Sequence, residues 1–280
     1  MFVVINVDDL GLNPAVRRAV EKLGSAGAVT SSTVMANGPD VENAAKVKCV
    51  GLGAHLNILR GTPLSDPSEI PSLVNEQGDF LGSYVSLLGR YVTGRIKHKE
   101  VELEWSRQID KLLGLGIELT HFDSEKHIHA WPTLMKIATK LARQYNIDWV
   151  RRPVECSSLA RLDTGALRTA VLNTCGLFQR KQEGVRWPDS LWGIADQGAE
   201  LLPEKFETFI KEHGPFDVVE ICCHPGFPEE GDPEIPANFG NLRVGYQWLD
   251  ECNALQAPEW KTVFAKLGAE VVSYGQIPKK

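Results

Sequence analysis

The 280-residue chain has the composition of an ordinary globular protein, with 43% hydrophobic and 24% charged residues, which is enough for a sizeable core. Its net charge of −6 and pI near 5.7 argue against a nucleic-acid or anionic-membrane partner, because both attract basic patches. No apolar stretch approaches transmembrane length, and no signal sequence opens the chain. We therefore expect a cytoplasmic enzyme or binding protein without membrane insertion.

The first predicted strand, 2–7, is almost continuously apolar, as expected of a central parallel strand covered on both faces. It ends at Asp8 and Asp9, and a helix over 14–26 follows with Asn13 as its N-cap. Two adjacent carboxylates at the end of a buried strand indicate a functional pair. The alternative is that one of them caps the next turn while the other is solvated.

Two further strands are predicted at 30–36 and 50–57, and the second places His55 near its carboxyl end. A lone histidine there is more often a packed core residue than a ligand, so His55 gains weight only from its neighbours. Residues 60–97 show little regular pattern, which is typical of a lid or a substrate-binding excursion. A helical period returns over 100–115.

The densest group of titratable side chains lies at 120–129, with the sequence THFDSEKHIH. It follows a predicted strand and precedes a helix over 132–145, the position where α/β folds place their chemistry. In an extended chain, Glu125, His127 and His129 share one face. The group predicts a metal or catalytic site, and the alternative is a solvated loop.

A short strand at 148–150 ends at Arg151, whose guanidinium could anchor a substrate carboxylate or sugar hydroxyl, or pair with the acidic cluster. Residues 156–200 are not assigned to elements. Within them, Trp187 and Trp192 could line a carbohydrate platform, and core packing explains these tryptophans at least as well.

The remaining elements are a helix over 203–213, a buried strand at 217–223 that ends at His224, a helix pair, and a strand at 270–274. At least six strands thus alternate with helices without a biased linker, so we predict one domain over 1–280. A single irregular TIM-type β/α barrel is favoured over a doubly wound sheet, because ionisable groups emerge from many strands. No GxGxxG or P-loop pattern points to a nucleotide cofactor.

The polar groups at the predicted strand ends would converge in such a fold. They are Asp8, Asp9, His55, Glu125, His127, His129, Arg151 and His224. A divalent cation needs about three protein ligands and an open position. The set therefore suits metal-assisted hydrolysis of an amide or ester: the metal lowers the pKa of water, a carboxylate takes its proton, and an imidazolium protonates the leaving amine.

Several short blocks between residues 6 and 226 occur together and in a known order. They are NVDDLGL from Asn6, TSST from Thr30 with Asn37-Gly38, GAHLN from Gly53, THFDS from Thr120 through His129, VRRP from Val150, and CHPG from Cys223. In these blocks the chain resembles the YdjC-like carbohydrate deacetylases, which include chitooligosaccharide and hopanoid-associated deacetylases. The resemblance implies a β/α barrel that uses a divalent metal, Mg or Zn, to hydrolyse the N-acetyl group of an amino sugar.

By position, the resemblance implies that Asp8 is the general base, that Arg151 orients it, and that His224 is the acid. It makes Asp9 and His55 metal ligands. A small carbohydrate is the expected partner, and the family also leads us to expect a homodimer. The residues that we expect to contact substrate are His129, Asn57, Trp187 and Trp192.

The chain departs from the family at one ligand. The family usually has Asp-Ser-His-x-His-x-His, and this chain has Glu125 in place of the first histidine, a metal ligand. Glu125 can bind Mg or Zn itself and make the site harder in character, or His127 can take over as the third ligand. A third reading is lost metal affinity. We expect metal binding to be retained.

The sequence thus predicts a metal-dependent carbohydrate N-deacetylase. Two alternatives stay open: another metal-assisted hydrolase, lyase or isomerase, and a non-catalytic carbohydrate-binding barrel that lost its metal through the change at Glu125.

Overall fold

A computed structural model describes residues 1–156, 164–179, 183–240 and 247–279 of the chain. Its centre is one sheet with the strand order β5-β4-β3-β2-β1-β7-β6, and β8 pairs with the start of β1. Every pairing between these strands is parallel. The strands are β1 (Phe2–Leu10), β2 (Ser31–Val34), β3 (Gly51–Leu56), β4 (Leu119–Ser124), β5 (Trp149–Val150), β6 (Ser190–Trp192), β7 (Val218–Cys223) and β8 (Glu270–Val271).

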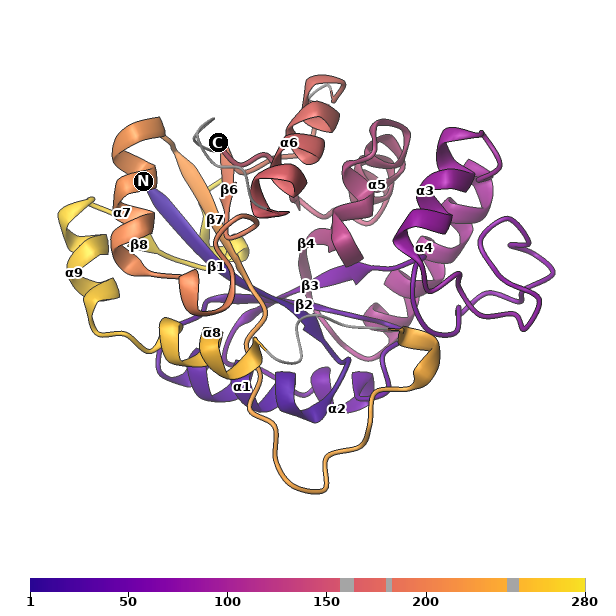
Figure 1. Cartoon of the computed structure of the whole chain (residues 1–280), viewed down its shortest axis with the longest axis horizontal. Helices are drawn as coiled ribbons and strands as arrows, with labels where there is room; N and C mark the ends of the chain where they lie inside the picture. Colours follow the sequence, from indigo (N-terminus) through magenta and orange to yellow (C-terminus); the bar gives the residue numbers. More distant parts are fainter. Residues whose placement is uncertain (157–163, 180–182, 241–246, 280) are drawn as a thin grey trace.

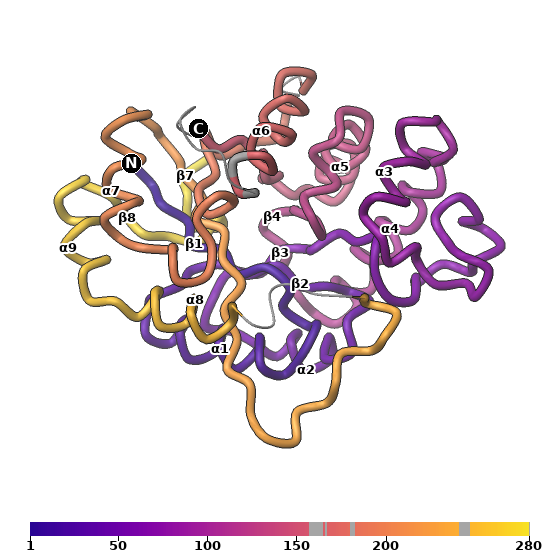
Figure 2. Tube along the Cα trace, viewed as in Figure 1, coloured from indigo at the N-terminus to yellow at the C-terminus, as the bar shows by residue number. Residues whose placement is uncertain are grey.

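The sheet is curled, and the helices lie along its outside (Figure 1). Figure 2 shows the same arc along the Cα trace, from α1 and α2 through α3 to α6 to the C-terminal helices. Parallel strands need such crossover helices, which leaves their carboxyl ends together at one edge. The helices are α1 (Pro14–Ser25), α2 (Val41–Ala44), α3 (Tyr84–Val92), α4 (His98–Gly114), α5 (Pro132–Gln144), α6 (Thr164–Leu177), α7 (Pro203–His213), α8 (Trp248–Leu255) and α9 (Glu259–Lys266).

The predicted α/β class and barrel-like curl of the sheet are confirmed, but the sheet does not close as a TIM barrel does, because it is open between β5 and β6. Among the described residues these edge strands share no ladder. Instead, the backbone of Arg186 pairs with Trp149 in β5: its amide donates to the Asp148 carbonyl, and its carbonyl accepts from the Val150 amide. The Leu191 amide donates to the Val154 carbonyl at 2.9 Å. β5 has two residues and β6 three, so neither offers enough backbone groups for a closing ladder.

Most predicted elements appear with shifted ends. Two ranges, 60–97 and 156–200, contain helices or strands that the sequence did not predict. α1 begins as expected, with the Asn13 side chain accepting the Ala15 amide at 2.9 Å. β1 continues through both aspartates to Leu10. Helix α6 and strand β6 fall in the range that sequence patterns left unassigned.

The excursion at 60–97 is held firmly against α4, and it contains α3. The Glu104 carboxylate accepts the amides of Leu64 and Ser65 at 3.0 and 2.8 Å, and Ile70 is fully buried. A buried carboxylate on two backbone amides replaces the ladder bonds that this irregular segment lacks. Whether the excursion acts as a lid stays a prediction.

Trp192 belongs to the core and not to a carbohydrate platform. Its side chain is 2% exposed and meets Phe206 and Trp260 edge-on, with ring centroids 5.3 and 6.2 Å apart. A tryptophan on a buried strand between packed aromatic rings has no face left for a sugar. Trp187 is half-buried, and the Arg152 guanidinium lies 5.6 Å from its ring centroid, so a substrate contact by Trp187 stays a prediction.

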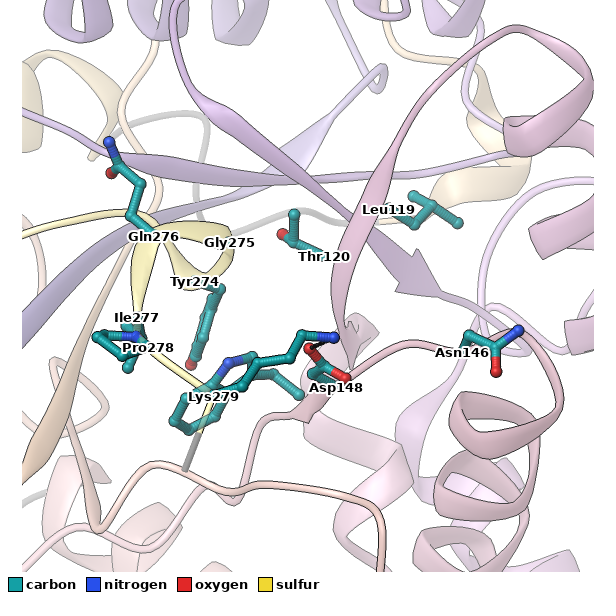
Figure 3. Close-up of a pocket in the computed structure, with 11 residues that line it drawn as sticks. Leu119, Thr120, Asn146, Asp148, Tyr274, Gly275, Gln276, Ile277, Pro278 and Lys279 are labelled. Carbon is teal, nitrogen blue, oxygen red and sulfur yellow. Dashed lines mark ion pairs between the residues drawn. The ribbon is translucent and has the colours of Figure 1, made fainter.

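A cavity lies at the amino-terminal edge of the sheet, away from the strand ends that carry the polar cluster. Figure 3 shows the C-terminal residues Tyr274 to Lys279 beside Thr120 and Asp148, at the start of β4 and β5. The Lys279 ammonium pairs with the Asp148 carboxylate at 2.8 Å. In the part of the chain described, no helix has the length and apolar character that crossing a bilayer requires.

We predict that Trp192→Ala lowers the free energy of unfolding by about 3–5 kcal/mol, because it removes a large buried ring. Urea unfolding measures this effect. As the control, Val92→Ala at a position that is 69% exposed should change stability by less than about 0.5 kcal/mol. A loss below about 1 kcal/mol for Trp192→Ala would show that the ring does not support the core.

Candidate metal and catalytic site

The end of β1 turns two adjacent carboxylates toward one site. Neighbouring strand residues normally point to opposite faces. Here the pairing with β2 slips between Val7 and Leu10, and Asp9 takes the left-handed conformation with φ of 65°. Such a bulge re-aims a side chain. As a result both carboxylates are buried, with Asp8 3.8 Å from His224 and Asp9 3.3 Å from His55.

Arg151, the residue that follows β5, binds Asp8 with two hydrogen bonds. Its amide extends the ladder by donating to the Phe122 carbonyl at 2.8 Å, and its side chain is fully buried. Nη1 and Nη2 donate to the two oxygens of Asp8 at 2.7 and 2.6 Å. Burial alone would raise the pKa of Asp8, but the Arg151 charge and hydrogen bonds hold it well below its usual value. Asp8 is therefore ionised.

Two more carboxylates share the same guanidinium. Asp123 lies 2.9 Å from Nη1, and Nε donates to Glu220 at 2.9 Å. Burial raises the pKa of Glu220, although Arg151 opposes the shift. Three carboxylates around one buried cation form a cluster in which removal of the cation would leave uncompensated charge.

His224 follows β7 and stands beside Asp8. Its Nε2 is 3.8 Å from Asp8 Oδ2, and its backbone amide donates to the Glu251 carboxylate. The imidazole is 14% exposed, so it is open to a bound molecule, whereas Asp8 is almost fully enclosed. The side-chain amide of Asn6 also donates to Asp8 Oδ1 at 2.9 Å. An ionised carboxylate and an imidazole thus lie side by side at the strand ends.

His55 is oriented to present a lone pair. Its Nδ1 contacts Asp123 Oδ1 at 2.8 Å, so Nδ1–H donates and Nε2 is left facing Asp9 at 3.3 Å and Glu125 at 3.7 Å. A carboxylate behind the far nitrogen is the usual support of a metal-binding histidine. Burial by itself would lower the pKa of His55, but Asp123 and the two facing carboxylates raise it well above its usual value. A proton or another cation is strongly favoured there.

The residues present fit a divalent cation between Asp9, His55 and Glu125. Within the described residues, Asp9 Oδ1 and His55 Nε2 are buried and face each other at 3.3 Å without the geometry of a hydrogen bond. Buried polar atoms left in this way are commonly explained by a bound water or ion. Ligand atoms about 2.0–2.1 Å from a tetrahedral zinc lie roughly 3.3 Å apart, close to the spacings here. Two other groups, the buried Asp8/His55/Asp123 and the partly exposed Asp8/Cys222/His224, are also compact. Both depend on Asp8, whose two oxygens already serve Arg151, so the first group fits an ion best.

Glu125, and not His127, reaches this group. It opens a 3-10 turn (Glu125–Ala130) in which Lys126 and His127 adopt left-handed φ values of 52° and 54°. The turn points Glu125 at His55, while the Arg60 Nε donates to Glu125 Oε1 at 2.6 Å. Burial opposes ionisation of Glu125, but hydrogen bonding to His55 and the nearby charges lower its pKa. The ring of His127 is half-buried, and its Nδ1 has no partner among the described residues.

His129 and Asn57 hold the loops and do not face the site. Both ring nitrogens of the fully buried His129 are occupied, by the Ser124 hydroxyl at 2.6 Å and the Arg151 carbonyl at 2.9 Å. The Asn57 side chain is buried and bonds the backbone of Leu59 and Arg60. The expected substrate contacts are therefore replaced by anchoring roles, which fix Arg151 and the turn after β3.

Sequence patterns missed three residues of the site: Asp123, Glu220 and Arg60. Asp123 could have been found, because it stands two positions before Glu125 on a predicted strand and metal-binding histidines commonly have a carboxylate behind them. Glu220 lies inside an apolar strand, and a lone charge there is itself a sign of buried pairing. Arg60 gave no sign, because it lies in an irregular segment.

The fold and site together define a parallel α/β protein whose carboxylate–histidine cluster at the strand ends fits a divalent cation. A family model described as "YdjC-like protein" matches residues 2–266, and the chain belongs to this family. The assignment made from sequence is thereby confirmed.

Relatives named "Carbohydrate deacetylase" match nearly end to end. The one from Geobacillus stearothermophilus is 27% identical over 282 residues, covering 99% of this chain and 98% of its own. The one from Halalkalibacterium halodurans is 30% identical over 240 residues, covering 82% and 87%. A crystal structure from Enterococcus faecalis, described as a cellobiose-phosphate cleavage protein, aligns with a TM-score of 0.71 at 22% identity, covering 99% of this chain and 98% of that one. This likeness shows the shared fold.

We predict that the protein loses stability in acid because His129 must remain neutral. Its Nε2–H donates to a carbonyl, and burial, the largest effect, lowers the pKa of His129 to about 3. The unfolded chain, with a pKa near 6.5, binds a proton first as pH falls. The free energy of unfolding should therefore be unaffected by His129 above about pH 6.5 and should fall by roughly 2 kcal/mol at pH 5.

Urea unfolding between pH 5 and 7.5 checks this. His129→Gln, which can donate to the same carbonyl without titrating, should reduce the slope, and the buried His121, whose pKa is also lowered to about 3, should keep part of it. His98→Gln, at an exposed position on α4, is the matched control and should leave the slope unchanged. An equal slope in His129→Gln and the wild type would contradict the assignment.

Proposed function

We propose that the protein is a metal-dependent hydrolase that removes the N-acetyl group from an amino sugar or chitooligosaccharide-like substrate. The observation that carries the proposal is the buried pair Asp9 Oδ1 and His55 Nε2, which face each other at 3.3 Å without a hydrogen bond, beside the ionised Asp8 and the accessible His224. Deacetylases among the end-to-end relatives support the reaction type and the carbohydrate class.

Asp9, His55 and Glu125 would hold the ion, Mg or Zn. When bound, such an ion supplies Lewis acidity, which lowers the pKa of a water and polarises an acetyl carbonyl. The protein's own groups move the protons. Asp8 accepts the proton of the attacking water, and His224 delivers one to the departing amine.

Arg151 sets how Asp8 works. Its two-pronged contact fixes both oxygens and keeps the carboxylate ionised, so Asp8 is always ready to accept a proton. The same charge would weaken Asp8 as a base, but Asp123 and Glu220 share the guanidinium and offset part of its field. The base is therefore oriented by a cation whose charge is shared with two other carboxylates, although the pKa of Asp8 stays below its usual value.

Acetate release from N-acetylglucosamine and its short β-1,4 oligomers tests the proposal. Turnover that a chelator abolishes and that added Zn or Mg restores would support it. Binding of these sugars without acetate release in metal-loaded protein would favour a non-catalytic binding barrel. Cleavage or isomerisation without acetate release would favour another metal-assisted reaction.

We predict about one equivalent of divalent metal in the wild type and none in His55→Ala, because His55 supplies the lone pair between Asp9 and Glu125. Elemental analysis after dialysis against metal and gel filtration measures this. His121→Ala is the histidine control: this buried ring bonds Asn6 at 2.8 Å and lies outside the ligand group. Full metal content in His55→Ala would sink the ligand assignment.

We predict that Asp8→Asn reduces turnover by at least about 10³-fold while metal content stays near the wild type. Asparagine keeps the size of Asp8 but cannot take the proton, and general-base removal costs about this much. Acetate release and elemental analysis on the same preparation measure both effects, and circular dichroism checks the fold. Surviving turnover would disprove the base assignment, and lost metal would make Asp8 a ligand.

A further inference from the structure

Arg60 is a buried cation that touches the proposed metal site. Its side chain is 5% exposed, and its Nε donates to Glu125 Oε1 at 2.6 Å. Its Nη1 donates to the Phe239 carbonyl, and its backbone amide donates to the Asn57 side chain at 3.1 Å. The guanidinium is therefore bound by Glu125 and by the Phe239 carbonyl, and the Asn57 contact fixes the Arg60 backbone.

Arg60 leaves Glu125 one free oxygen. Oε1 accepts from the guanidinium, and Oε2 is the oxygen that lies 3.7 Å from His55 Nε2. A glutamate free of such a contact can offer both oxygens to one cation, which suits large, hard ions such as Ca. With one oxygen taken, Glu125 can act as a single-atom ligand, as the histidine usual at this position of the family does.

Arg60 also balances the extra negative charge. The ligand set that the family resemblance implies, one aspartate and two neutral histidines, carries one negative charge. Here Asp9 and Glu125 carry two, and the guanidinium beside Glu125 returns the site to one. Two carboxylates without the arginine would bind hard cations and protons more strongly.

We infer that Arg60 is a positioning residue that makes Glu125 a one-oxygen, charge-balanced replacement for a histidine ligand. The inference rests on the proposed metal site and goes beyond it. It implies that residues 60 and 125 act as a pair. Histidine at 125 then requires that residue 60 lose its charge, because an unpaired guanidinium would face the ion.

Metal affinity in a set of variants tests the pair. Zn and Mg are titrated into metal-free wild type, Glu125→His, Arg60→Gln and the double variant, with calorimetry as the readout and no substrate present. We expect Glu125→His alone to bind Zn at least tenfold more weakly than the wild type. Adding Arg60→Gln should restore Zn affinity to within about threefold.

Selectivity separates a role at the metal from a general role in folding. Arg60→Gln alone should raise the affinity for Mg relative to Zn by at least about threefold, since it leaves the second carboxylate charge of the site unbalanced and so favours the harder cation. A role in folding alone would not move this ratio. As the control, Arg107→Gln removes a surface arginine paired with Glu69, and it should neither shift the ratio nor rescue Glu125→His.

The outcomes are distinct. Zn binding by the wild type, with no gain in the double variant over Glu125→His, would overturn the pairing and leave the metal site standing. Undiminished Zn affinity in Glu125→His with Arg60 in place would do the same. If the wild type binds neither ion, both the proposed function and this inference fall.

Discussion

The buried guanidinium of Arg151 is the contact on which the site depends. It joins β1, β4 and β7 through Asp8, Asp123 and Glu220, from a position just past β5. Charges this deep persist only when each has a partner, because desolvation costs several kcal/mol per ion. The four side chains must therefore assemble together, and their assembly sets the relative positions of strands that are far apart in sequence.

The polar cluster is a consequence of the parallel sheet and of local departures from regular backbone. The carboxyl ends of parallel strands lie at one edge of the sheet, so residues from β1, β3 and β4 meet there although they are far apart in the sequence. Alternation would still send Asp8 and Asp9 apart. The left-handed conformation of Asp9 corrects this in β1, and two further left-handed residues shape the turn after β4 that carries Glu125. Backbone strain of this kind gathers where side chains must converge.

Sequence patterns were sufficient to locate the polar residues near the carboxyl ends of the strands. They were insufficient to predict the segments and side chains that surround those residues. Apolar runs located β1, β3, β4 and β7, and the polar residues that follow them converge because topology does the rest. The open seam was not predictable, since β5 and β6 are too short to produce a period. Trp192 and His129 were misassigned for one reason: residue type indicates what a side chain can contact, whereas burial decides what it does contact.

Third ligands are hard to choose from spacing alone, and the turn after β4 shows why. In an extended chain Glu125 and His127 would point the same way, so period alone left both as ligands. The left-handed backbone at Lys126 and His127 breaks that alternation and sends the two side chains apart. Non-glycine residues seldom adopt this conformation, and local sequence gives little warning of it.

Two arginines bind the carboxylates of the site in different ways. Arg151 covers both oxygens of Asp8, which leaves that carboxylate ionised and fixed but closed to direct metal ligation. Arg60 covers one oxygen of Glu125 and leaves the other facing His55. Asp9, the third carboxylate, keeps an oxygen with no hydrogen-bond partner among the described residues. With Asp8 as the proposed proton acceptor and Glu125 as a proposed ligand, the number of oxygens that an arginine occupies separates the two roles within a few ångströms, where the identity of the side chains alone would not.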